Sequence, residues 1–317
     1  MAIGEISGLK MGQATRDAFG EALRDLGDQF PEVVTVDGDV GNSTRTEWFA
    51  QKFPNRSFNV GIAESNMVSV AGGLAAQGKT AVVASFACFL LNNAFDQIRM
   101  SVAFPNLNVK LVGSHAGISI GEDGPSQMGI EDVALASCLP GVTVCVPTDA
   151  VSTQAATKAM LEHNGPVYLR LGRPKAPVVY PDGCDFQFGK SIQLTDGDDI
   201  TIIANGLMVG MALDAAKSLK DSGIAARVID MHTVKPIDEE AIIKAATETG
   251  RIVVAEEHLA AGGLGSAVSM VTARTRPVPM SFVNVGDQYA ESGDPDGLLE
   301  KYGLTAGNIV EAARSIL

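Results

Sequence analysis

The chain has 317 residues, a hydrophobic fraction of 46% and a formal net charge of −13. Its length exceeds that of a usual single domain, so two domains are expected, and its composition is typical of an α/β protein with enough apolar residues for two cores. The acidic balance argues against nucleic acid or an anionic membrane surface as the main partner, although a few local arginines can still bind an anionic metabolite.

The first residues and the cysteines bear on cellular location. The N-terminal segment has no basic stretch followed by an apolar run, so no signal peptide is predicted. The longest apolar run, "TAVVASFACFLL", has about half the length of a membrane span. The cysteines form no C-x-x-C pair and no cluster with histidine, which indicates buried free thiols. We therefore expect a cytoplasmic protein without a membrane partner.

Short β-branched runs alternate with helical patterns along the first half of the chain. Helices are expected at 14–30, "ATRDAFGEALRDLGDQF", and at 92–104, "NNAFDQIRMSVAF". The predicted strands are 33–38, 57–62, 80–86, 108–115, 142–147 and 166–172. Such alternation predicts a parallel sheet with crossover helices.

A proline-containing segment separates this region from a second alternating one. Residues 174–189, "PKAPVVYPDGCDFQFG", have no helical period and are predicted to be an extended linker. The strands predicted after it are 199–206, 225–234, 251–258 and 280–286, and the helices are 207–223, 238–250 and one after the turn "HLAAGGLGSAV". The predicted fold class is therefore α/β with two domains, 8–180 and 190–317, each a mostly parallel sheet with helices on both faces.

The candidates for chemistry follow predicted strands, where α/β proteins place their sites. Glu64 lies between a strand and a helix start, where a carboxylate is usually a cap. His115 ends a strand, and the polar loop after it contains Asp123. Arg170 and Arg173 end another strand and could hold a phosphate or pair with carboxylates. These residues predict a site built from Glu64, His115, Asp123 and Arg173, with the reaction class left open.

Two further patterns favour a structural interpretation. The glycine-rich turn at 258–268 could cradle a phosphate at a helix N-terminus, but it lacks the spacing of a dinucleotide fingerprint. A tight turn that lets a helix pack closely is therefore preferred. Phe86, Phe89 and Phe95 recur at near-helical spacing, which is more usual for a core than for a binding surface.

Four stretches together resemble the C-terminal half of transketolases, a family of thiamine-diphosphate enzymes. They are "GIAESNMVSVAGGLAAQG", "SFACFLLNNAFDQIRMS", "GSHAGISIGEDGPSQMGIEDVA" and "YLRLGRP". A full-length transketolase has three domains, and the resemblance, from about residue 11 to the end, covers the pyrimidine-binding and C-terminal domains. The family's G-D-G motif, with asparagine ligands for Mg²⁺ or Ca²⁺, is not found, since "DGDVGN" has a different order and spacing. The resemblance thus implies the small subunit of a split transketolase. Its partner chain would carry the diphosphate and metal domain, in an α2β2 assembly.

The resemblance also implies which residues hold the cofactor. Glu64 matches the glutamate that hydrogen-bonds a ring nitrogen of the aminopyrimidine, and its carboxyl group must carry a proton to stabilise the imino tautomer. Phe86 and Phe89 resemble the aromatic wall beside that ring, in place of the core role. Asn92 and Asp39 are implied as further cofactor contacts.

Other positions resemble the substrate site. His115 matches the histidine that contacts the donor hydroxyls and the reacting carbon unit, and Asp123 matches the aspartate that reads a substrate hydroxyl. Gln127 stands where many transketolases have a second histidine, as in the animal-type pattern. The residues that resemble the phosphate-binding set at the channel mouth are Arg16, Ser43 and Arg173.

The implied reaction moves a two-carbon glycolaldehyde unit from a ketose phosphate to an aldose phosphate, as in the pentose phosphate pathway. One alternative is the β subunit of the first component of a 2-oxoacid dehydrogenase, which shares the two-domain layout and the glutamate. Another is a transketolase specialised for a branched or sulfonated ketose. A non-catalytic protein that kept the fold is disfavoured because Glu64 and Asp123 are both present. The resemblance gives the C-terminal domain a mainly structural role in dimer packing and gives His258 no catalytic role.

Overall fold

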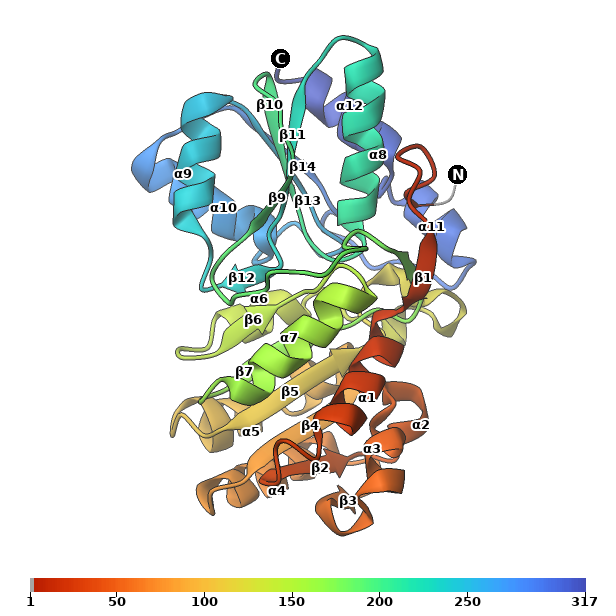
Figure 1. Ribbon diagram of the computed structural model, residues 1–317, viewed down its shortest axis with the longest axis vertical. Coiled ribbons are helices and arrows are strands. Elements are labelled where there is room, and N and C mark those ends of the chain that lie inside the picture. The colour runs from red at the N-terminus through yellow and green to blue at the C-terminus, as the bar shows by residue number, and fades with distance from the viewer. Residues whose placement is uncertain (1–2) are drawn as a thin grey trace.

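A computed structural model describes residues 3–317, and β-branched runs build a seven-stranded sheet in its first domain (Figure 1). The strand order is β12-β6-β7-β5-β4-β2-β3. Six strands pair in parallel, namely β2 (Val33–Asp37), β3 (Ser57–Asn59), β4 (Thr80–Phe86), β5 (Val109–Ser114), β6 (Thr143–Cys145) and β7 (Val167–Arg170). All six lie within the predicted ranges, which confirms the parallel sheet.

Helices cover both faces of this sheet because successive strand residues point to opposite sides. On one face, Val82 and Val112 pack with Phe19 of α1 (Thr15–Leu26) and Met160 of α7 (Ala150–Glu162). On the other face, alternate strand residues pack against α4 (Glu64–Ala76). The helix predicted at 92–104 is instead a short α5 (Phe95–Ile98) between two π-helical turns, residues 89–93 and 99–103. The remaining helices are α2 (Gly41–Thr44), α3 (Thr46–Lys52) and α6 (Asp132–Ser137).

The second domain repeats this plan with five strands in the order β14-β13-β10-β11-β9. Its parallel strands are β10 (Ile200–Ala204), β11 (Ala226–Asp230), β13 (Ile252–Ala255) and β14 (Met280–Val283), and β9 (Ile192–Thr195) is an antiparallel edge. One face carries α8 (Met208–Asp221) and α12 (Ala306–Arg314), and the other carries α9 (Glu239–Glu248) and α10 (Leu264–Thr275) (Figure 1). A short α11 (Pro295–Lys301) precedes α12. The α/β class with helices on both faces is confirmed in both domains.

One predicted strand, 225–234, is in fact two strands in two sheets. The chain leaves the second-domain sheet at Asp230, and β12 (Thr233–Lys235) then pairs antiparallel with β6 of the first domain. At the break, the Asp230 carboxylate accepts hydrogen bonds from Thr148 and Tyr180, two residues that precede the second domain in the chain. A backbone ladder therefore ties the second domain to the first.

Two smaller features complete the comparison with the predictions. The predicted linker contains β8 (Lys175–Pro177), which pairs antiparallel with β1 (Met11–Ala14). All four cysteines are free, but Cys138 is exposed, because it caps the end of short α6, so the prediction of buried thiols is wrong there. Within residues 3–317, no helix combines the length and apolar character that a membrane crossing needs.

Candidate active site

Glu64, the first residue of α4, is a buried carboxyl group, 6% exposed. Its Oε1 accepts a hydrogen bond from the Ser85 hydroxyl of β4, at 3.0 Å. A capping side chain bonds to the N–H groups of its own helix, whereas Glu64 bonds to a side chain of a strand, so it is not a cap. Within residues 3–317, its other oxygen, Oε2, accepts no hydrogen bond. One carboxyl oxygen therefore remains for a bound group.

His115 lies at the end of β5 in the left-handed region, with φ +56°, which is uncommon for a residue with a side chain. Its Nε2 is 2.8 Å from Nη1 of Arg16, and its Nδ1 is 2.8 Å from the Ser114 hydroxyl. Because a guanidinium group can only donate, Nε2 must accept and Nδ1 carries the proton. Burial, followed by the charges of nearby arginines, lowers the pKa of His115 to about 3. The imidazole is therefore neutral at pH 7.

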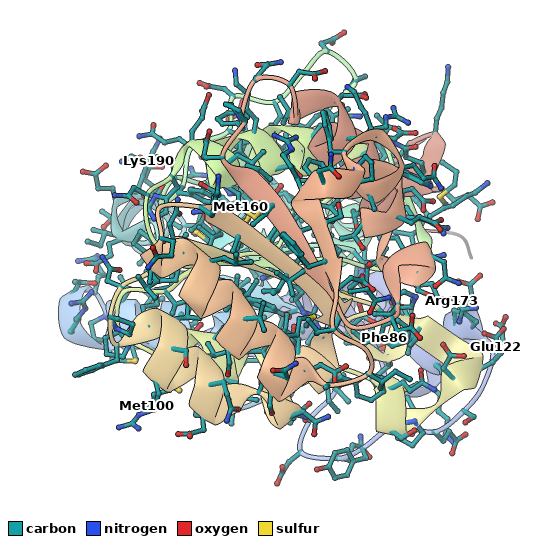
Figure 2. The ribbon with its side chains drawn as sticks, turned by 90° about the horizontal axis from the view of Figure 1, so that it is seen from below. Phe86, Met100, Glu122, Met160, Arg173 and Lys190 are labelled. Atoms are coloured by element: carbon teal, nitrogen blue, oxygen red, sulfur yellow. The ribbon has the colours of Figure 1, made fainter. Side chains whose placement is uncertain are left out.

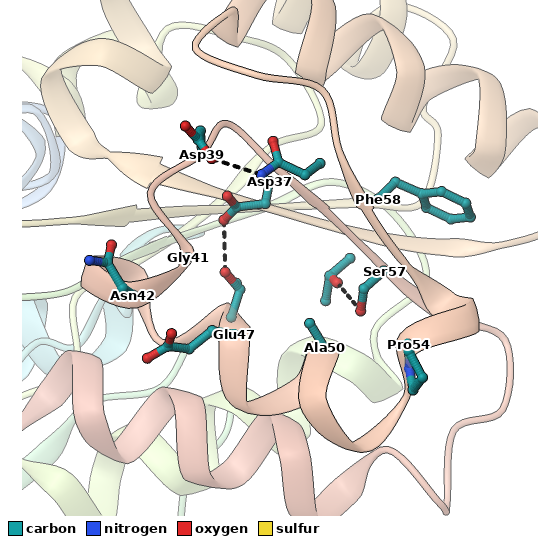
Figure 3. Close-up of a pocket in the computed structure, with 12 residues that line it drawn as sticks. Asp37, Asp39, Gly41, Asn42, Glu47, Ala50, Pro54, Ser57 and Phe58 are labelled. Atoms are coloured by element: carbon teal, nitrogen blue, oxygen red, sulfur yellow. Dashed lines mark hydrogen bonds between the residues drawn. The ribbon is translucent and has the colours of Figure 1, made fainter.

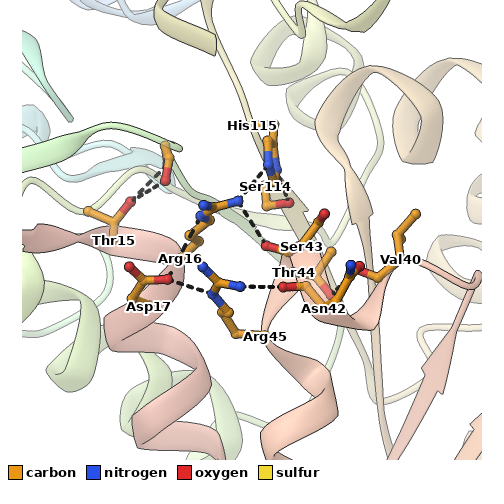
Figure 4. A network of polar contacts seen from close by, with 11 residues as sticks. Thr15, Arg16, Asp17, Val40, Asn42, Ser43, Thr44, Arg45, Ser114 and His115 are labelled. Atoms are coloured by element: carbon orange, nitrogen blue, oxygen red, sulfur yellow. Dashed lines mark hydrogen bonds and ion pairs between the residues drawn. The ribbon is translucent and has the colours of Figure 1, made fainter. Parts of the chain in front are cut away.

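Three arginines lie near enough to His115 to act on its charge, namely Arg16, Arg45 and Arg173. Figure 4 shows the first two of them beside the histidine. Arg16 also donates to the backbone oxygen of Ser43, at 3.2 Å. Its buried Nε lies 3.8 Å from the Asp17 carboxylate and has no hydrogen-bond partner among residues 3–317. Burial and the nearby Arg45 lower the pKa of Arg16. Like charges gathered around an unpartnered N–H are an arrangement that favours an anion.

Arg45 belongs to this cluster, although the sequence analysis did not include it. Its backbone has φ +70°, and its guanidinium pairs with Asp17 at 2.6 Å and donates to the backbone oxygen of Asn42. The available signal was its place two residues after Ser43, in a turn that was already a candidate. Sequence spacing alone does not reveal that a left-handed residue turns this side chain toward α1.

Arg173 and Asp123, predicted separately as substrate-binding residues, contact each other. Nη1 of Arg173 donates to the backbone oxygen of Ile120 at 2.8 Å and lies 3.4 Å from the Asp123 carboxylate and 3.5 Å from that of Glu122. Figure 2 shows Phe86, Arg173 and Glu122 on one side of the molecule. The arginine is therefore held beside the loop that follows His115, and its carboxylate partners are exposed and can be exchanged for a ligand anion.

Phe86 and Phe89 form a stacked aromatic surface beside the histidine. The Phe86 ring lies 3.9 Å from the His115 ring and 5.6 Å from the Phe89 ring, nearly parallel to both. Phe86 is buried in a core cluster, whereas Phe89 is half-buried. Of the other candidates, Asn92 is exposed and donates to Glu131 at 2.7 Å, and Gln127 is half-buried in a short 3₁₀ turn.

Asp39 makes its side-chain contact away from the histidine network. It is exposed, has φ +66°, and accepts a hydrogen bond from Asn59 at 3.0 Å. It lines a hollow of about 530 Å³ that also contains the acidic side chains of Asp37 and Glu47 (Figure 3). Asp37 itself bonds to the Val40 N–H and the Thr46 hydroxyl, so it stabilises the turn. No group of three or more metal-ligating side chains occurs within residues 3–317.

Two other candidates for anion binding are satisfied inside the protein. Arg170 is buried and pairs with Asp132 at 2.8 Å, so it faces neither a phosphate nor the surface. At the glycine-rich turn, the first N–H groups of α10 donate to the Glu256 carboxylate at 2.7 and 2.8 Å. A side chain of the protein thus occupies the position that a phosphate would need, and the tight-turn interpretation is supported.

The remaining accessible groups define what this site can bind. A flat ring with a nitrogen acceptor could stack on the Phe89 surface and meet the unused Glu64 oxygen. A dianionic group could bind to the arginines, and hydroxyl groups could meet the neutral His115. The geometry suits a heteroaromatic cofactor next to a small polyhydroxylated anion.

Comparison with known proteins gives two family matches. Residues 11–178 match the transketolase pyrimidine binding domain, and residues 189–309 match the transketolase C-terminal domain. The 6-deoxy-6-sulfo-D-fructose transketolase subunit SqwH of Clostridium sp. (strain MSTE9) is 42% identical, over 95% of this chain and 94% of that protein. The transketolase of Mus musculus is 39% identical, over 96% of this chain and 49% of that protein. A solved structure described as a split gene transketolase, inactive beta4 tetramer, is 47% identical with a TM-score of 0.91, over 96% of this chain and 99% of that chain.

Proposed function

The chain belongs to the transketolase family, and on that premise we propose that it is the small subunit of a split, thiamine-diphosphate-dependent transketolase. The observation that carries the proposal is the buried Glu64, which is bonded to Ser85, the residue before Phe86, and has one carboxyl oxygen without a hydrogen bond within residues 3–317. A separate chain would supply the diphosphate-binding domain and the ligands for Mg²⁺ or Ca²⁺. Two copies of each chain are expected, because oligomers prefer closed two-fold symmetry.

The residues on this chain fit the aminopyrimidine ring of thiamine diphosphate. Glu64 would hold a proton at Oε2 and donate it in a hydrogen bond to a ring nitrogen, while Oε1 stays fixed by Ser85. Phe86 and Phe89 would cover one face of the ring, with Asn92 and Asp39 as outer contacts. The chemistry that the cofactor supplies when bound is an electron sink for cleavage of a ketose carbon–carbon bond.

The neutral His115 would orient the sugar. Its Nε2 has a lone pair that accepts from Arg16, so it can accept from a donor hydroxyl instead when Arg16 turns to the phosphate. Asp123 would read a substrate hydroxyl, and Gln127 would take the position of a second histidine. The groups that would bind the sugar phosphate are Arg16, Ser43, Arg45 and Arg173.

Two alternative substrates differ in their support. The relatives reported above carry transketolase names, so the 2-oxoacid dehydrogenase interpretation is not favoured. A sulfonated ketose has one specific observation in its favour, because SqwH is named for a sulfo-fructose and a sulfonate could bind the same arginines. A phosphate remains our first candidate, since three guanidinium groups suit a dianion better than a monoanion.

The test is a glycolaldehyde-transfer assay with thiamine diphosphate and Mg²⁺. This chain, the candidate partner chain and their mixture are each given xylulose 5-phosphate or a sulfonated ketose, with an aldose phosphate as acceptor. Activity in the mixture alone is the expected result. Activity of this chain by itself would contradict the proposed location of the metal site. Turnover of the sulfonated ketose but not of xylulose 5-phosphate would show that the donor sugar carries a sulfonate and not a phosphate.

A further inference from the structure

A loop of the first domain follows His115 and is closed at its neck. Residues 116–129 leave the end of β5 and return to it, because Ala116 and Gly129 form a β-bridge and the Gly117 N–H donates to the Gly129 oxygen at 2.7 Å. The loop carries Asp123 and Gln127, and Arg173 is bonded to it. Its position therefore determines where several candidate substrate-binding groups lie.

The second domain holds this loop through a segment that directly follows β13. Oε1 of Glu257 accepts a hydrogen bond from the Ser119 N–H at 2.7 Å, and the Ser119 hydroxyl also bonds to this carboxylate. The Leu259 N–H donates to the Ile130 oxygen at 2.9 Å, just beyond the loop. Arg170 joins the two sides, since one nitrogen donates to the backbone oxygens of both Gly129 and Glu257. The segment thus binds the loop at its start and at its end.

The fit between Glu257 and the loop leaves no space for movement. Gly117 has φ +83°, and a Cβ there would lie 2.1 Å from the carboxyl carbon of Glu257. The loop also approaches the second domain at Gly121 and Gly124, where a Cβ would lie 2.8 Å from Pro295 and 2.3 Å from Ser292. The adjacent cavity, lined by Glu257, Arg170 and Ser119 among others, holds only about 30 Å³, which leaves room for water but not for a sugar or a cofactor. Glu257 therefore acts on the loop directly and not through a bound ligand.

The neighbouring Glu256 makes a different set of bonds. Both its oxygens accept from N–H groups in the first turn of α10, inside the second domain. Two adjacent buried glutamates thus have separate tasks, one within its own domain and one across the domain boundary. If both glutamates only stabilised the second domain, Glu257 would not need to bond to the loop that follows His115.

We propose that Glu257 is a positioning residue of the active site, which holds the 116–129 loop so that His115 and Asp123 face the ketose donor. The inference rests on the proposed function and extends it, because it gives the C-terminal domain a part in sugar binding. Displacing a substrate-binding group by about 1 Å can cost on the order of 100-fold in rate. Glu257 would influence the reaction through that geometry without touching the substrate.

The experiment compares Glu257→Asp, Glu257→Gln and Glu256→Asp in the complex with the partner chain. Aspartate is shorter by one methylene, roughly 1.5 Å, so E257D moves the carboxylate away from Ser119 but keeps its charge. Glutamine keeps the length and the acceptor oxygen. We expect E257D to lower kcat/KM for the ketose at least tenfold, with an unchanged Kd for thiamine diphosphate, and E257Q to stay within about threefold of wild type. E256D, the same chemical change one residue earlier, should lower the Tm but leave kcat/KM unchanged.

Amide hydrogen exchange supplies a readout that does not depend on activity. Peptides covering residues 116–123 should exchange at least tenfold faster in E257D than in wild type or E256D, with protection elsewhere unchanged. The proposal would be overturned if E257D had the same amide exchange rates and the same kcat/KM as the wild type. It would also be overturned if E256D and E257D lost equal activity, in proportion to the fall in their Tm. A wild-type complex inactive on every ketose would refute the proposed function, while the exchange result would still decide whether Glu257 holds the loop.

Discussion

Two buried polar clusters differ in how their hydrogen-bonding groups are used. The active-site cluster comprises Glu64, His115 and Arg16, and the boundary cluster lies between the domains and comprises Asp132, Arg170, Asp230, Glu256 and Glu257. In the active-site cluster, an oxygen of Glu64 and the Nε of Arg16 have no hydrogen-bond partner within residues 3–317, although this Nε lies 3.8 Å from the Asp17 carboxylate. At the domain boundary, both oxygens of Glu256 and the Oε1 of Glu257 accept hydrogen bonds from backbone N–H groups. Both clusters follow parallel strands, so the strand-end rule applies to both equally. Unused bonding capacity alone does not mark a binding site, because Asp132 and Asp230 at the domain boundary each have a buried carboxylate oxygen without a hydrogen-bond partner within residues 3–317. At the candidate active site the unused groups occur together with several arginines and a stacked aromatic surface.

The largest effect is expected at Glu64. Glu64→Gln keeps the acceptor for Ser85 but cannot hold a transferable proton at the free oxygen, so kcat of the complex should fall by about 10²- to 10⁴-fold. The fall is measured in the transfer assay, with the Tm of each chain as the control for folding. Normal turnover in E64Q would remove the distinction between the two clusters that we draw here.

The strands could be predicted well because burial on both faces of a parallel sheet gives short, continuous runs of apolar residues. The prediction failed where a tertiary contact decides the outcome. Residues 225–234 split into two strands because β12 pairs with β6, which is far away in the sequence, and Asp230 at the break bonds to the distant Thr148 and Tyr180. Arg45 was missed for a similar reason, because a left-handed backbone directs its side chain. Nor did any local pattern reveal that Glu257 contacts Ser119, 138 residues earlier.

The second-largest effect is expected at Asp132 of the boundary cluster, where a substitution should lower the stability of the fold rather than the turnover. Asp132 accepts from Arg170 at 2.8 Å and from the Tyr168 hydroxyl at 2.5 Å, and all three side chains are buried. Asp132→Asn leaves the guanidinium without its counter-charge, which should cost about 3–5 kcal/mol in the free energy of unfolding. Urea titration measures this cost. The exposed pair of Lys217 and Asp221 is the control, since D221A should cost at most about 0.5 kcal/mol.

A smaller and more selective effect is expected at the arginines. Arg173→Ala should raise the KM for a phosphorylated ketose by about 10- to 100-fold, because a charge-assisted hydrogen bond contributes roughly 1.5–3 kcal/mol. The KM for an unphosphorylated ketose should change little. Arg45→Gln sharpens the test, since its more remote charge should give a smaller increase with the same selectivity. An equal change for both ketoses would contradict phosphate binding at these residues.

The smallest effect is a pH dependence of stability that arises at the domain boundary. Burial raises the pKa of Asp230 to about 7, and its buried Oδ1 has no hydrogen-bond partner in the described part of the chain, residues 3–317. Because the folded pKa lies above the ordinary value of 3.8, the group's contribution to stability is fully present below pH 3.8 and is lost as the pH rises through about 7. Asp230→Asn keeps an acceptor for Tyr180 but does not titrate, so its Tm relative to wild type should rise between pH 5 and pH 8.

Tyr180→Phe makes this last prediction more specific. The Tyr180 hydroxyl donates to Asp230 at 2.6 Å and thereby lowers the pKa that burial has raised. Without that bond, the carboxyl group should stay protonated to a higher pH, and the decline in Tm should move upward on the pH axis. A Tm difference between D230N and wild type that is constant from pH 5 to pH 8 would show that Asp230 does not titrate in this range. In that case the boundary cluster would hold a permanently charged carboxylate, and the contrast with the active-site cluster would rest on geometry alone.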